Sequence, residues 1–186
     1  MKEEEAFEIR FAHKEDWEDA MGLAWKTFLE FEAGDYAPEG IRSFEDFISD
    51  TGLKRMFLSG DYQMMVAWSK GRMVGMITLR NETHISLLFV EKSSHRQGIG
   101  RALIGEMADY ARKRFGADCL TVNASPYGVL FYHKLGFKDL GPQQRREGII
   151  FTPMKYVLSG GRNIAPAARS LQAAERRGDL YGIHSQ

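Results

Sequence analysis

The sequence contains a single cysteine, Cys119, among 186 residues. One cysteine cannot form an intrachain disulfide framework or a cysteine-based zinc site. The chain also lacks an excess of either charge, because its 25 basic and 25 acidic residues cancel. A neutral chain has no overall field that gathers polyanions, so nucleic acid is not an expected partner.

Long apolar runs are absent as well. No run approaches the roughly twenty apolar residues that span a bilayer, and no apolar signal-peptide core follows the charged residues 1–5. The histidines do not have the spacing of a metal site. We therefore expect a cytoplasmic protein that makes no membrane contact and holds no metal.

What the sequence does contain is typical of one globular domain. Its hydrophobic content of 44% and charged content of 27% are ordinary, and its length suits a single sizeable core. The composition changes after Leu158, where Ser159-Gly160-Gly161 reads as a flexible joint. We expect a domain over residues 1–158 and a tail over 159–186, in which residues 166–177 form an alanine-rich helix.

Periodicity predicts the order strand, two helices, three strands, helix, strand, helix, two strands. This order indicates a mixed α/β sheet with helices on both faces. Apolar alternation and helical spacing place six of the seven strands over residues 7–11, 63–68, 73–79, 85–90, 120–123 and 148–158, and the helices over 15–33, around 44–48, over 100–115 and from Pro126 to Gly136. Pro153 is expected at an edge or bulge of the last strand.

A glycine turn follows the third of the consecutive strands. The apolar run 85–90 ends at a polar loop that closes on Gly98-Ile99-Gly100, and a helical pattern begins at once. The N–H groups at a helix N-terminus have no partner within the helix, and glycine, which has no Cβ, lets an anion come close to them. Such a turn is typical of a phosphate site. A P-loop is excluded because Arg101 follows where lysine is required. A dinucleotide fingerprint remains as an alternative, with Asp118 placed for the ribose but Leu103 where a small residue is needed.

Two segments carry a family resemblance. His95-Arg96-Gln97-Gly98-Ile99-Gly100 resembles the Gln/Arg-x-x-Gly-x-Gly/Ala signature of the GNAT N-acetyltransferases, with His95 departing at the first position. The segment 125–137 is similar to the family's Asn-x-x-Ala-x-x-Phe-Tyr-x-x-x-Gly-Phe block. In that block Ser125 and Gly128 depart from the pattern, whereas four residues match: Phe131, Tyr132, Gly136 and Phe137. The resemblance extends over about residues 7–158.

The resemblance implies a fold and an activity. The fold would be a single-domain, mostly antiparallel mixed sheet with helices on both faces and a splayed central strand pair. The activity would be direct transfer of an acetyl group from acetyl-CoA to a primary amine of a small molecule or peptide, within a ternary complex. The alternatives are a non-catalytic acyl-CoA-binding regulatory module and an enzyme acting on aminoacyl-tRNA; the balanced charge argues against the latter.

The resemblance also assigns roles to residues. Tyr132 takes the position of the general acid, and a phenol with a pKa near 10 can protonate a departing thiolate. Ser125 stands at a cofactor-contacting position. The remaining cofactor contacts are main-chain contacts to pantetheine from Leu88, Phe89 and Val90, and contacts around the pyrophosphate from Arg96, Gln97, Gly98, Ile99, Gly100 and Arg101.

His84 is the predicted general base. It lies eleven residues before His95, about where histone-type members of the family carry a glutamate, and imidazole titrates near neutral pH. A surface histidine at a strand end, with a water chain acting as the base, is the alternative.

An acidic stretch predicts the character of the acceptor. Arg42 is the only basic residue between Thr27 and Asp50, and Phe31, Tyr36 and Phe44 are interleaved with the acids Glu30, Glu32, Asp35, Glu39, Glu45, Asp46 and Asp50. Such a wall would attract a cationic amine, although an ordinary solvated helical face fits the same pattern. The sequence leaves the oligomeric state open, with a homodimer among the options.

Overall fold

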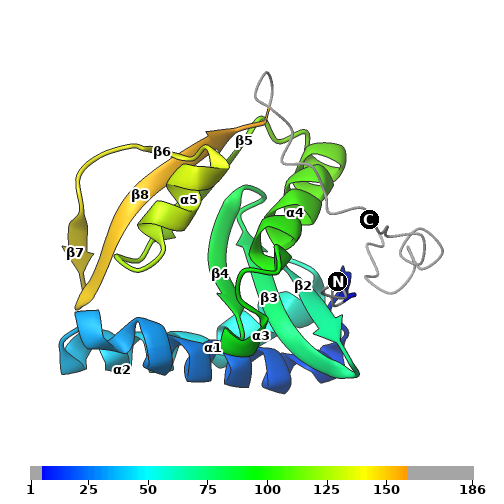
Figure 1. The fold of residues 1–186 in the computed structure, drawn as a ribbon, viewed down its shortest axis with the longest axis horizontal. Helices are drawn as coiled ribbons and strands as arrows, with labels where there is room; N and C mark the ends of the chain where they lie inside the picture. Colours follow the sequence, from blue (N-terminus) through cyan, green and yellow to red (C-terminus); the bar gives the residue numbers. More distant parts are fainter. Residues whose placement is uncertain (1–5, 159–186) are drawn as a thin grey trace, which may run out of the picture.

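The computed structural model describes residues 6–158, which form one sheet with helices on either side (Figure 1). The sheet has eight strands in the order β1-β2-β3-β4-β5-β8-β6, with β7 also paired to β8. The strands are β1 (Glu8–Phe11), β2 (Tyr62–Ser69), β3 (Arg72–Arg80), β4 (His84–Val90), β5 (Cys119–Ala124), β6 (Lys138–Asp139), β7 (Gln144–Arg146) and β8 (Ile149–Val157). The tail 159–186, with the helix expected in it, lies outside the described residues.

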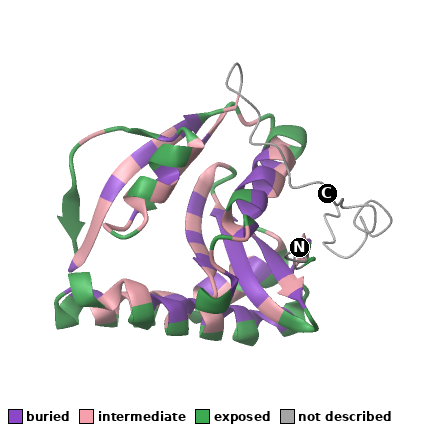
Figure 2. Ribbon diagram, viewed as in Figure 1, coloured by how far each residue is buried: buried purple, intermediate pink, exposed green. Residues whose placement is uncertain are grey.

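The described helices cover both faces of the sheet, as the sequence predicts. They are α1 (Trp17–Phe31), α2 (Pro38–Ile48), α3 (Thr51–Ser59), α4 (Ile99–Phe115) and α5 (Val129–Leu135), with short 3-10 turns at Lys14–Asp16, Ala33–Asp35 and Lys92–Ser94. One hydrophobic cluster joins α4 and α5 to the sheet, and a second joins α1, α2 and α3 to the opposite face. Figure 2 shows the buried residues concentrated on the central strands and on the inner side of α4.

The two central strands part partway along their length. The parallel strands β4 and β5 pair at two positions, His84 with Thr121 and Ile85 with Val122, and β4 then continues to Val90. A bulge bends β4 at this point, because Thr78 pairs with Leu87 while the next residue of β3 pairs with Ile85. This geometry confirms the splayed central pair that the resemblance implies.

Buried hydroxyl groups hold the bulge. The Thr78 hydroxyl oxygen accepts a hydrogen bond from the Leu87 N–H at 3.0 Å and another from the Tyr62 hydroxyl at 2.7 Å. The Leu87 amide, which the bulge removes from the strand ladder, is therefore satisfied inside the core. Because the buried Leu87 amide keeps a hydrogen bond at the bulge, β4 can leave β5 here without loss of stability.

Some elements differ from the sequence expectations. Helix α3 was not predicted, and α5 begins at Val129 after a turn over residues 126–128 rather than at Pro126. Pro153 lies in β8, which has neighbours on both sides, and its carbonyl accepts the Leu140 N–H at 2.8 Å. Its missing N–H points to that same side, where β8 passes from pairing with β6 to pairing with β7. Locally, Pro153 therefore occupies the edge position that proline needs.

Candidate active site

The glycine turn folds into a loop with two residues of positive φ directly before α4. Arg96 has φ of 63° and Gly98 has φ of 80°, and the latter residue is the N-cap of the 17-residue helix α4. Among residues 6–158, no side chain caps this N-terminus. Two residues of positive φ next to an uncapped helix start leave backbone N–H groups that are suited to a phosphate. Arg96 and Arg101 are both exposed beside it, so two guanidinium groups are available at the same place.

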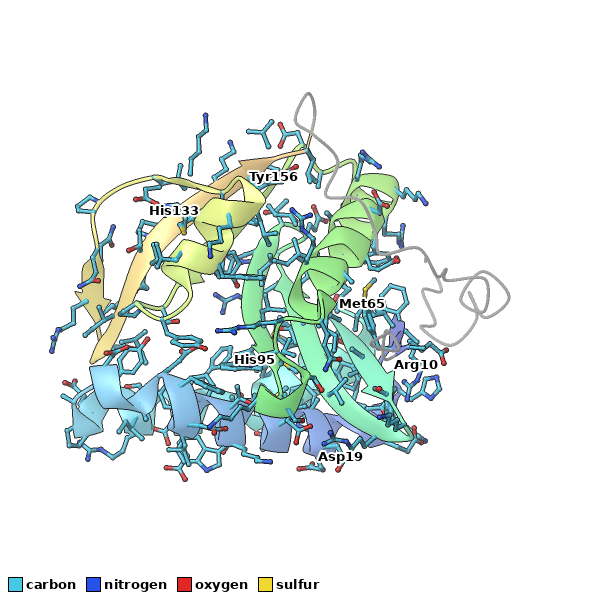
Figure 3. All side chains as sticks on the ribbon, viewed as in Figure 1. Arg10, Asp19, Met65, His95, His133 and Tyr156 are labelled. Carbon is cyan, nitrogen blue, oxygen red and sulfur yellow. The ribbon has the colours of Figure 1, made fainter. Side chains whose placement is uncertain are left out.

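His95 ties this loop to the end of β4. Its Nε2 atom lies 2.7 Å from the carbonyl oxygen of Val90, and since a carbonyl only accepts, Nε2 carries the proton. The other loop residue predicted here, Gln97, donates from its side chain to the Ser93 carbonyl at 3.3 Å. Figure 3 shows His95 between the end of β4, the start of α4 and α1. The histidine that departs from the family signature thus has a defined structural partner.

Close packing joins the glycine loop to α5. A Cβ atom at Gly100 would stand 3.1 Å from Cζ of Phe131 and 3.8 Å from Cγ2 of Val90. Gly100 is needed for this close approach, whereas Gly98 is needed for its positive φ. The neighbouring Ile99 directs its side chain into the core, which leaves its backbone at the start of the helix. The two family-like segments therefore meet in space.

The side chains of the β4 residues predicted to contact pantetheine alternate between the two faces of the sheet. Phe89 belongs to the cluster under α1, while Leu88 and Val90 pack against the cluster under α4. They lie beyond the point where β4 leaves β5, so their backbone borders the opening between the two strands.

Tyr132 lies at the inner side of α5. It is 7% exposed and packs edge-to-face against Phe131 and Phe137 at ring-centroid distances of 5.3 and 5.2 Å. Burial raises the pKa of its hydroxyl, and the negative charge of Glu32 adds to this rise. A phenol in this environment stays protonated at neutral pH and can donate a proton.

Glu32, which follows the last turn of α1, is the site residue that the sequence reading did not single out. Its half-buried carboxyl receives a hydrogen bond from the Ser125 hydroxyl. Burial raises the pKa of Glu32 to about 7, against the effect of this hydrogen bond, and the charge of Asp35 contributes to the rise. Glu32 in turn raises the pKa of Tyr36, after the larger effect of burial. Ser125, predicted as a cofactor contact, thus bonds to an acid contributed by a segment far away in sequence.

Contacts with the glycine loop position the end of α1. The Lys92 ammonium lies 2.8 Å from the Glu30 carboxylate, and the ring of Phe31 packs on those of His95 and Tyr127 at 4.9 and 5.2 Å. These contacts join α1 to the loops after β4 and after β5. The chain leaves α1 at this junction, which carries Glu32 to Ser125.

His84 lies at the opposite, closed end of the strand pair. Its Nδ1 atom is 2.9 Å from the Thr121 hydroxyl, at the position where β4 and β5 still pair. Burial lowers the pKa of His84, and the positive charge of Arg80 lowers it further. The structure therefore does not bring His84 together with Glu32, Ser125 and Tyr132.

The acidic stretch divides into residues with different environments. Glu30 pairs with Lys92, and Asp50 caps α3 by accepting the Leu53 N–H at 3.0 Å. Phe44 is half-buried, stacks on Phe28 at 4.0 Å and meets Phe89 of β4 edge-to-face at 5.8 Å. Of the seven acids, Glu32 is the one that reaches Ser125 and Tyr132.

Comparison with known proteins identifies the family. The sequence profile of the acetyltransferase (GNAT) domain matches residues 32–158, which is more than half of the chain. The chain therefore belongs to the GNAT acetyltransferase family, and this family uses acetyl-CoA as the acyl donor. No curated protein sequence matches the chain.

Solved structures share the fold. A GCN5-related N-acetyltransferase from Rhodopseudomonas palustris is 25% identical, with a TM-score of 0.71 over 81% of this chain and 95% of its own. The PaiA N-acetyltransferase from Thermoplasma acidophilum, solved with coenzyme A, is 22% identical, with a TM-score of 0.67 over 82% and 99%. The YncA protein from Salmonella typhimurium, solved with its cofactor acetyl-CoA, is 21% identical, with a TM-score of 0.61 over 88% and 99%.

Two further properties concern membranes and metals. In residues 6–158, no helix combines the length and apolar character needed to cross a membrane. Over the same part of the chain, no group of three or more His, Cys, Asp or Glu side chains is arranged to hold a metal ion.

Proposed function

We propose that this protein is an acetyl-CoA-dependent N-acetyltransferase that acts on a primary amine of a small molecule or peptide. The observation that carries the proposal is the junction of three features at one place. The uncapped start of α4 follows the stretch of β4 that has left β5, and Tyr132 on α5 packs against Phe131, whose ring approaches Gly100 at that helix start. The non-catalytic acyl-CoA-binding module predicted as an alternative would not need a protonated tyrosine there.

The donor fits the residues that are present. Backbone N–H groups of Gly98, Ile99 and Gly100, with the guanidinium groups of Arg96 and Arg101, would hold its pyrophosphate. The backbone of Leu88, Phe89 and Val90, freed from β5, would bond the pantetheine amides. Bound acetyl-CoA supplies the acetyl group as a thioester.

Tyr132 is proposed as the general acid. Its hydroxyl would give a proton to the sulfur as the thioester bond breaks, and burial keeps that proton in place at neutral pH. No hydrogen bond within the described residues engages this hydroxyl, so it remains available as a donor. His84, a water chain and Glu32 are the candidates for the group that deprotonates the amine.

The acceptor is proposed to be cationic. Glu32 and Asp35 bring negative charge to the side of the sheet covered by α1 and α2, and an ammonium group would be attracted there. A protein acting in the cytoplasm, as a monomer or a homodimer, fits this proposal.

A thiol-release assay tests the proposed function. Wild-type protein is supplied with acetyl-CoA and, in turn, spermidine, kanamycin, a lysine-containing peptide and the acidic amine glutamate. We expect amine-dependent release of coenzyme A that is faster with the cationic acceptors. Binding of acetyl-CoA without release in the presence of any amine would favour the regulatory-module alternative.

A further inference from the structure

The environment of Glu32 is incomplete in one respect. Among residues 6–158, no lysine, arginine or histidine forms an ion pair with its half-buried carboxyl. Its polar contact is the hydroxyl of Ser125, and its charge acts on Tyr132 and Tyr36. A partly buried carboxylate without a cation is costly unless a cation is supplied from outside.

The Ser125 side chain is itself fixed. Its Oγ atom accepts the Gly128 N–H at 3.2 Å, and its carbonyl accepts the N–H groups of Gly128 and Val129 at 2.9 and 3.1 Å. A Cβ atom at Gly128 would stand 3.3 Å from Ser125 Oγ and 3.4 Å from the Tyr132 ring. Ser125 and Tyr132 therefore flank the same residue, and Glu32 is held beside them from α1.

We propose that Glu32, oriented by Ser125, is the catalytic residue that binds the acceptor as an ammonium ion and removes its proton. This inference rests on the proposed function. It identifies the group that activates the amine, and it places the base at the end of α1, close enough to the acid on α5 for its charge to raise the pKa of Tyr132.

The protons balance over one turnover. The ammonium group gives one proton to the Glu32 carboxylate, which later releases it to water. The nitrogen lone pair forms the bond to the carbonyl carbon, the carbon–sulfur bond breaks, and the sulfur takes the proton of Tyr132. The second proton lost by the nitrogen returns Tyr132 to its neutral form, so the products are the amide, coenzyme A and one released proton.

Electrostatics favours Glu32 over His84 for this role. An imidazole that accepts a proton must carry a positive charge beside Arg80 and within a half-buried pair of strands. Glu32 instead becomes neutral on accepting a proton, which burial favours. The charge of Arg80 would also repel an approaching ammonium group.

The acid limb of the rate profile should report on Glu32. The titratable groups that face it are Asp35 and Tyr36 from the segment after α1 and Tyr132 from α5. The tyrosines stay neutral, and the charge of Asp35 supports the pKa of about 7 that burial produces at Glu32. The active form, with Glu32 ionised, is therefore lost as the pH falls through neutrality.

The test compares pH profiles of kcat/KM for wild type, Glu32→Gln, His84→Ala and Glu15→Gln, using the best cationic amine found in the thiol-release assay. Glu15 is an exposed carboxylate just before α1, so its variant controls for loss of one negative charge. We expect Glu32→Gln to lower kcat/KM by about 100-fold or more and to flatten the acid limb. In His84→Ala and Glu15→Gln, kcat/KM should still fall on the acid side of the pH profile as it does in wild type. A limb that persists in Glu32→Gln, or one that disappears in His84→Ala, would overturn the inference.

Binding measurements separate this inference from the proposed function. Calorimetric titration should give Glu32→Gln the wild-type affinity for acetyl-CoA. With coenzyme A, which carries no acetyl group, the variant should bind the same amine at least about tenfold more weakly than wild type does. Equal amine affinity of Glu32→Gln and wild type would contradict the role of Glu32 and leave the proposed function intact. Failure of wild type to bind acetyl-CoA would contradict the proposed function.

Discussion

The Nε2 atom of His95 lies 2.7 Å from the carbonyl oxygen of Val90, and the same imidazole packs on the ring of Phe31. One side chain therefore links the end of β4, the loop before α4 and the end of α1. The shape of the glycine loop and the placement of Glu32 therefore depend on the same junction.

We expect His95→Ala to weaken acetyl-CoA binding about fivefold, because one hydrogen bond contributes roughly 1 kcal/mol to holding the loop. His95→Gln, which retains a donor for the Val90 carbonyl, should lose less than His95→Ala. Calorimetric titration measures both. Equal affinity of wild type and His95→Ala would show that the loop is held without this bond.

Ser125→Ala should move the acid limb of kcat/KM to higher pH. The hydroxyl of Ser125 lowers the pKa of Glu32, so its removal lets that pKa rise. The Gly128 N–H still bonds the Ser125 carbonyl at 2.9 Å, so the turn should persist. Ser59→Ala, at an exposed hydroxyl of α3, is the matched control. If the acid limb of kcat/KM lies at the same pH in Ser125→Ala as in wild type, the Ser125 hydroxyl does not set the pKa of Glu32.

Glu32→Gln should stabilise the protein at alkaline pH. The pKa of Glu32 is raised from 4.5 to about 7 on folding, so between these values the folded chain binds more protons than the unfolded chain. The free energy of unfolding of wild type therefore falls as the pH rises through this range. A glutamine side chain cannot ionise, so the variant avoids this loss. It should exceed wild type by about 2–3 kcal/mol near pH 8 and by little near pH 4.

Chemical unfolding at several pH values measures this difference, without cofactor or amine. A difference that does not change with pH would show that the carboxyl of Glu32 has an ordinary pKa in the folded protein.

Gly100→Ala should lower the free energy of unfolding only while Phe131 is present. The new Cβ would stand 3.1 Å from Cζ of the Phe131 ring, and forcing the two apart costs about 1 kcal/mol. In a Phe131→Leu background the same substitution should cost about 1 kcal/mol less. A double-mutant cycle of unfolding free energies checks this, and additive effects would contradict the contact.

The glycine loop before α4 could be predicted from the sequence because its determinants are local. Gly98 and Gly100 follow an apolar strand and open a helix, and these features are visible within one short segment. Helix α3 is harder to predict because it has only nine residues, too short for a clear helical period, and its place in the fold comes from packing Leu53 and Phe57 under the sheet.

Glu32 could not be singled out for a different reason. In the sequence it is one of seven acids, and what distinguishes it is burial next to Ser125 and Tyr132, which lie far along the chain. The aromatic residues show the same limit, since the sequence does not indicate that Phe44 stacks on Phe28. Such contacts depend on how α1 crosses the sheet, which no local pattern encodes.

Calorimetric titration of acetyl-CoA into wild type, Gly98→Glu and Gly116→Glu tests the donor site most directly. Both glycines have positive φ, 80° at the start of α4 and 66° at its end, and a Cβ at either would meet no atom within 4 Å. The two variants therefore carry similar backbone strain and the same added charge. We predict that wild type and Gly116→Glu bind acetyl-CoA and that Gly98→Glu does not. Unchanged binding by Gly98→Glu, or no binding by wild type, would contradict the assignment of the α4 N-terminus as the acetyl-CoA site.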